Sequence, residues 1–179
     1  MNTYPCNASA MHASAMTLNH AKDIAGWRYG GEYAMYDFDG SDELIAELMG
    51  GGYVACTDDA GALLGYLCFG ADARIPTREA NAYQGGWLDI GLGLRPELCG
   101  RGLGASLVQL GISLCRERGC EAVRRALDEC EGSLCGLRLT VAEFNLRARR
   151  LYERMGFAEC AQVCHRMSGM RFIVMTREL

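Results

Sequence analysis

The chain has few prolines, little excess charge and no long apolar run, and each shortage excludes a class of protein. Three of its 179 residues are proline, half are hydrophobic and 22% are charged, which excludes a disordered or collagen-like chain. The 18 basic and 22 acidic residues leave a formal net charge of -4, too small to indicate a nucleic-acid-binding surface. No window reaches the ~18 apolar residues of a membrane span. We therefore expect a globular protein that binds neither nucleic acid nor membrane.

The first twenty residues lack the features of an export signal. They contain no Lys or Arg and no continuous apolar core, both of which a secretory signal carries. We therefore expect a cytoplasmic protein. The length is that of one domain of the usual ~100–200 residues. We expect residues 1–10 to form a flexible leader and residues 11–179 to form that domain.

The ten cysteines lack the CxxC pairs that structural zinc sites commonly use. Cys115 and Cys120 are separated by four residues, and so are Cys130 and Cys135. Disulfides are not expected either, because the chain has no export signal and is long enough for a hydrophobic core. We expect reduced thiols and no metal. A thiol-based metal or redox protein stays open as a third interpretation.

Hydrophobic spacing and turn residues predict alternating helices and strands. The expected elements are, in order, a helix from Asn19 to Trp27, a helix from Ser41 to Gly50, strands at 53–57 and 63–69 joined by a hairpin turn, a strand at 87–94, a helix that begins near Leu103, a partly helical connection at 119–135, a strand at 137–141, a helix at 145–155, and strands at 157–167 and 171–177.

Three glycines, Gly100, Gly102 and Gly104, stand between the strand at 87–94 and the following helix. Backbone N–H groups at such a junction can converge on an anion at the positive end of the helix dipole. Neither GxxxxGK[ST] nor GxGxxG is present, so a nucleotide triphosphatase and a dinucleotide-binding fold lose their main support. The glycines predict a phosphate site, although a tight turn without a ligand also needs them.

The helix at 145–155 presents an amide, a cation and a phenol on one face. Asn145, Arg149 and Tyr152 fall at i, i+4 and i+7, which brings them together. Two of them also have a purely structural interpretation: Asn145 suits a helix N-cap, and Tyr152 suits a half-buried core position.

Two motifs in these segments resemble the GNAT superfamily of N-acetyltransferases. The pattern [Q/R]-x-x-G-x-[G/A] corresponds to Cys99–Gly104, with Cys99 departing at its first position. The pattern N-x-x-A-x-x-L-Y-x-x-x-G-F is matched in full from Asn145 to Phe157. The resemblance implies an α+β (mixed α/β) fold, in which helices flank a twisted mixed sheet of about seven strands. It also implies a splay between strands 4 and 5, and makes 119–135 an insertion.

The resemblance further implies acetyl-CoA as cosubstrate, bound in the splay. Its pantetheine arm is expected on Leu92, Gly93 and Leu94. The remaining cofactor contacts are expected from Gly100, Arg101, Gly102, Leu103, Gly104, Ala105, Asn145 and Arg149.

The implied reaction is acetyl transfer to an amine of a small molecule or peptide, by direct attack through a tetrahedral intermediate. Tyr152 is expected to protonate the leaving CoA thiolate. Asp89 is the first choice for the base, because strand alternation puts it on the same face as Gly91 and Gly93. Glu143 and a water chain are the alternatives. Cys99 as a nucleophile is disfavoured because its motif contains no His.

An aromatic and acidic wall is expected to receive the acceptor amine. Its rings are Trp27, Tyr29, Tyr33, Tyr36 and Phe38, with acidic residues between them. The same rings would also suit packing of helices on the sheet. A non-catalytic CoA-binding module is the alternative function, and a homodimer is left open.

Overall fold

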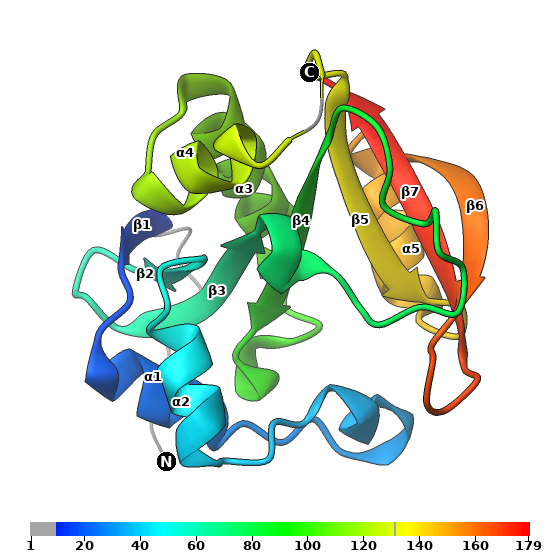
Figure 1. Cartoon of the computed structure of the whole chain (residues 1–179). Helices are drawn as coiled ribbons and strands as arrows, with labels where there is room; N and C mark the ends of the chain where they lie inside the picture. The colour runs from blue at the N-terminus through cyan, green and yellow to red at the C-terminus, as the bar shows by residue number, and fades with distance from the viewer. Residues whose placement is uncertain (1–9, 131) are drawn as a thin grey trace.

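Residues 10–130 and 132–179, which the computed structural model describes, fold around a seven-stranded mixed sheet (Figure 1). The strand order is β1-β2-β3-β4-β5-β7-β6. The strands are β1 (His12–Ala15), β2 (Tyr53–Thr57), β3 (Leu63–Phe69), β4 (Trp87–Leu94), β5 (Gly136–Ala142), β6 (Ala158–Cys164) and β7 (Arg171–Glu178). Only β4 and β5 are parallel among these neighbours. The predicted mixed sheet is confirmed.

The parallel strands β4 and β5 separate along their length. They pair only where Trp87–Asp89 faces Gly136–Arg138, whereas β4 continues to Leu94 and β5 to Ala142. Beyond the paired part, β4 stays with β3 and β5 stays with β7 (Figure 1). The sheet therefore has the predicted splay between its fourth and fifth strands.

The helices lie close to their predicted ranges. They are α1 (Leu18–Ala25), α2 (Asp42–Leu48), α3 (Leu103–Glu117), α4 (Glu121–Asp128) and α5 (Leu146–Arg154), with short 3-10 turns η1 (Gly31–Tyr36), η2 (Gly70–Ala73) and η3 (Pro96–Leu98). Ser41 Oγ caps α2 as expected, accepting from Leu44 N at 3.1 Å. Asn19, where the sequence predicted that the first helix begins and which it could cap, lies instead inside the first turn of α1, and the cap is Thr17, whose Oγ1 accepts from His20 N.

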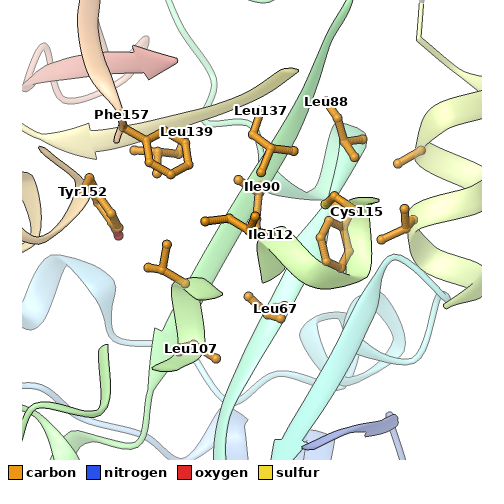
Figure 2. Packing of buried hydrophobic residues seen from close by; sticks show 14 of the residues in the cluster. Leu67, Leu88, Ile90, Leu107, Ile112, Cys115, Leu137, Leu139, Tyr152 and Phe157 are labelled. Carbon is orange, nitrogen blue, oxygen red and sulfur yellow. The ribbon is translucent and has the colours of Figure 1, made fainter. Parts of the chain in front are cut away.

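The two faces of the sheet carry separate cores because strand side chains alternate between them. On β3, Leu67 and Phe69 join the core formed with α3, α4 and α5, whereas Cys68 joins the core formed with α1 and α2. Figure 2 shows the first of these cores, where Ile112 of α3 lies against Ile90 of β4. Helix α4, from the predicted insertion, contributes Ala122, Val123 and Ala126 to this core.

The connection of residues 74–86, here named the 74–86 strap, joins the two halves of the sheet. It leaves η2 beside β4, yet Arg78 N donates to Cys164 O at 3.0 Å at the end of β6. Pro76 O accepts from Arg166 N at 2.8 Å in the β6–β7 turn. In Figure 1 the strap passes in front of β5. The 74–86 strap is therefore held in place by backbone hydrogen bonds to residues that are distant in the sequence.

Of the predicted leader, residues 1–9 lie outside the described residues. The nine cysteines from Cys56 to Cys164 are free thiols. Within the described ranges, no helix is long and apolar enough to cross a membrane.

Candidate active site

A cavity of about 400 Å³ lies where β4 and β5 diverge. Its walls come from both strands, from the glycine loop before α3, from α5 and from the segment between α1 and α2. The predicted site residues that line it are Leu92, Gly93, Leu94, Gly100, Gly102, Gly104, Ala105, Asn145 and Tyr152. The predicted residues that do not line it are Asp89, Arg101, Leu103 and Arg149.

The edge of β4 directs backbone groups into the gap. Arg95 N donates to Leu64 O on β3 at 2.9 Å. Because the direction of the N–H and C=O groups alternates from residue to residue along a strand, those of Gly93 also face β3. Those of Leu92 and Leu94 face the gap. Strand β5 no longer pairs with β4 here. The Leu94 carbonyl accepts from the Tyr29 hydroxyl at 2.9 Å. The N–H and C=O of Leu92 are thus directed into the gap between β4 and β5.

Gly93 is explained by a neighbour within the protein. A Cβ at this position would overlap the Tyr66 ring. This neighbour is an aromatic side chain that also lines the cavity.

The glycine loop leaves the start of α3 uncapped. Gly100 and Gly102 have φ values of 79° and 85°, in the left-handed region that favours glycine. No side chain caps α3, so N–H groups of its first turn lack intrahelical partners. A Cβ on Gly102 would meet nothing within 4 Å. Gly104 serves packing instead, because its Cβ would lie 2.8 Å from Leu151 Cδ2.

Asn145 and Tyr152 reach the cavity from α5. Asn145 caps the helix, accepting from Ala148 N at 3.1 Å, and its Nδ2 donates to the Tyr36 hydroxyl at 3.3 Å. Tyr152 is 8% exposed, and its hydroxyl points away from Phe157 in Figure 2. Burial, and secondarily the Tyr36 hydroxyl, raise the pKa of Tyr152 well above its ordinary value. The phenol is therefore protonated at physiological pH.

Arg149 turns away from this group. Its Nε donates to Glu159 Oε1 at 3.1 Å and its Nη1 donates to Glu143 O at 2.9 Å. Helical spacing correctly put its Cα beside Asn145 and Tyr152, but its long side chain extends toward the carboxylate of Glu159 on β6. The expectation of a cofactor contact from Arg149 is not supported.

The position of Asp89 argues against its predicted role as a base. Its carboxylate is 2% exposed and accepts from Arg138 Nε at 2.6 Å and Arg74 Nε at 2.7 Å. Asp89 lies on the same strand face as Gly91 and Gly93, as strand alternation predicts. It is, however, at the end of β4 that pairs with β5, outside the gap. Glu143, the alternative base, is bound by Gln162 Nε2 and Arg171 Nε. Neither carboxylate lines the cavity.

Tyrosines form much of the opposite wall. Tyr29, Tyr33 and Tyr36 line the cavity, whereas Trp27 and Phe38 pack against Tyr66 with ring centroids 6.0 and 5.9 Å away.

The acidic residues beside these rings stabilise the backbone instead. Asp37 accepts from Tyr29 N and Asp39 accepts from Ser41 N. No carboxylate lines the cavity within residues 10–130 and 132–179.

Two cavity arginines were missed by the sequence analysis. Arg147 and Arg154 line the cavity from α5. Their separation of seven residues is a helical repeat that could have identified a shared face. The described part of the chain contains no group of three or more metal-ligating side chains.

The structure thus combines a sheet split between two parallel strands, an uncapped helix start and a buried tyrosine that lines the cavity at the split. The family model described as "Acetyltransferase (GNAT) family" matches residues 18–157. The chain belongs to this family of acetyltransferases. No curated protein matches its sequence.

Solved structures share the fold at low sequence identity. An acetyltransferase (GNAT family) from Bacillus anthracis superposes with a TM-score of 0.68 at 12% identity, over 96% of each chain. AAC(6')-Ib in complex with ribostamycin and coenzyme A gives 0.66 at 16%, over 94% of this chain and 93% of the other. A spermidine N-acetyltransferase SpeG chimera from Vibrio cholerae and hSSAT gives 0.62 at 17%, over 95% and 96%.

Proposed function

We propose that this protein is an acetyl-CoA-dependent N-acetyltransferase that transfers an acetyl group to an amine of a small molecule or peptide. One observation carries the proposal: a single cavity is lined by the glycine loop at the uncapped start of α3, by the unpaired edge of β4 and by the buried Tyr152. Family membership supports acetyl transfer in general.

The residues present fit acetyl-CoA. The open space at Gly102 and the unsatisfied N–H groups of α3 suit a diphosphate. The gap-facing backbone of Leu92 suits the amides of the pantetheine arm, which bind like an added strand. When bound, acetyl-CoA supplies an acetyl group activated as a thioester.

Tyr152 is the proposed proton donor. Its hydroxyl is protonated at physiological pH, so it carries the proton that a thiolate leaving beside it requires. Because Asp89 and Glu143 do not line the cavity, we assign removal of the acceptor's proton to water at the cavity mouth. This is the third of the routes considered from the sequence.

The tyrosine-lined wall suggests the kind of acceptor. Ring faces attract one ammonium group, but among the described residues no carboxylate lines the cavity to pair with further cations. We therefore propose an amine with one cationic centre on an apolar or aromatic body. Spermidine and ribostamycin, named for two similar structures, each carry several amines.

Release of CoA thiol over a panel of acceptors tests the proposal. The panel contains arylalkylamines, peptide N-termini, polyamines and ribostamycin at equal concentrations. We expect the highest kcat/KM among the monoamines. Turnover of polyamines alone would contradict the proposed acceptor class, but it would still support N-acetyltransferase activity. Tight CoA binding without turnover of any amine would favour the non-catalytic module.

A further inference from the structure

The glycine loop places no cationic side chain in the cavity. Its first motif position is Cys99, where the pattern has Gln or Arg, and the Cys99 thiol lies 3.7 Å from the Arg95 carbonyl. The exposed Arg101 side chain of the same loop does not line the cavity. A diphosphate bound here would meet backbone N–H groups but no charge from the loop itself.

Arg147, on the first turn of α5, occupies the space beside this loop. Its Nη1 lies 3.7 Å from the position that a Cβ would take on Gly100. Its guanidinium carbon lies 5.3 Å from the centre of the Tyr33 ring, a cation–π contact that orients it. Burial raises the pKa of the Cys99 thiol, and the neighbouring Arg147 charge opposes that rise. Within the described ranges, no carboxylate pairs with Arg147.

We infer that Arg147 supplies from α5 the cation that the glycine loop lacks, and that it binds the diphosphate of CoA. The inference rests on the proposed function, since it concerns the same cavity. A guanidinium can donate two parallel hydrogen bonds to phosphate oxygens, and this one adjoins the uncapped end of α3. Tyr33 contacts the same guanidinium, so the segment between α1 and α2 contributes to the carrier site.

Calorimetric titration with CoA, without any acceptor, tests the role of Arg147. Arg147→Ala should weaken CoA binding by about 10- to 100-fold, the effect of losing a charge-assisted hydrogen bond. Arg150→Ala is the matched control, because it removes an exposed arginine of the same helix that does not line the cavity. Equal affinity in the two variants, with unchanged melting temperatures, would overturn the inference.

Moving the charge back to the loop provides a second test. Cys99→Arg in the Arg147→Ala background should recover most of the lost affinity, because both positions flank Gly100. A double variant that binds no better than Arg147→Ala contradicts the inference.

Titration with dephospho-CoA separates the two phosphate groups of CoA. The loss caused by Arg147→Ala should be the same with this probe, which retains the diphosphate. If Arg147→Ala weakens binding of CoA but not of dephospho-CoA, Arg147 binds the 3′-phosphate and the inference is overturned. Failure of the unaltered protein to bind CoA would instead overturn the proposed function.

Discussion

Burial changes the chemistry of the Tyr152 hydroxyl. The ring packs edge-on to Phe157, with centroids 6.1 Å apart, and the desolvated phenol has a raised pKa. A phenol of ordinary pKa would begin to ionise near pH 10. The buried one keeps its proton over the whole range in which the protein is expected to work, and its raised pKa also makes it a weaker acid than an exposed phenol.

Replacing Tyr152 by Phe removes the hydroxyl that is the proposed proton donor and changes the volume of the side chain little. We expect kcat to fall about 10²- to 10⁴-fold, the usual range for a general acid, with an unchanged Kd for CoA. Steady-state kinetics and calorimetry measure the two quantities. Tyr53→Phe is the control, because its hydroxyl donates to Glu47 at 3.0 Å outside the cavity. An unchanged kcat in Tyr152→Phe removes this residue from the acid role.

At the scale of elements, a buried ion pair marks the point where β4 and β5 part. Asp89 and Arg138 are the last paired residues of the two strands. Their side chains are bonded to each other and are 2% and 3% exposed as residues. Arg138 also donates to the carbonyls of Tyr83 and Gln84 in the 74–86 strap. One guanidinium thus ties the strap to the paired end of both strands.

Asp89→Asn tests this structural role against the role of base. Loss of the carboxylate leaves the Arg138 charge buried without a partner, so the free energy of unfolding should fall by about 3–5 kcal/mol in urea titration. Asp59→Asn, at the exposed pair with His12, should cost less than about 1 kcal/mol. The folded Asp89 variant should keep kcat within about threefold. A 100-fold loss of kcat in folded protein would restore Asp89 as the base.

At the scale of the whole molecule, the core holds ionisable groups that must stay neutral. Burial raises the pKa values of Cys56 and Cys115 from 9.0 to about 12. In the folded state these thiols keep their protons at a pH where the unfolded chain has released them. Their contribution to stability is therefore complete below pH 9 and is lost as the pH rises toward 12.

The free energy of unfolding should accordingly decline above about pH 9. Each such thiol adds a slope of up to ~1.4 kcal/mol per pH unit. Urea titrations at pH 7, 8, 9 and 10 under reducing conditions measure it. Cys115→Ala should reduce the slope although it also lowers the stability at pH 7 by leaving a small cavity. A stability that rises between pH 9 and 10 would contradict the expected sign.

Local signals explain why most of the elements, and the places of Asn145 and Tyr152 on α5, could be predicted. The cap at Ser41, the hairpin turn before β3 and the repeat along α3 involve residues close in sequence, so their physics is readable there. The motif from Asn145 to Phe157 likewise lies on one helix and its end. The roles of Asp89 and Arg149 could not be predicted, because each depends on a charged partner from another element.

By itself, the sequence determined the order of helices and strands from α1 onward, but not strand β1, together with the glycine loop before α3 and the shared helix face of Asn145 and Tyr152. Hydrogen bonding over a few residues and hydrophobic repeats are enough for that. Only the tertiary structure decided which side chains meet in the cavity. Long side chains contact the groups that the packed elements bring near them: a ring for Arg147, and a carboxylate for Arg149 and Arg138. Which groups come near depends on contacts between segments that are distant in the sequence.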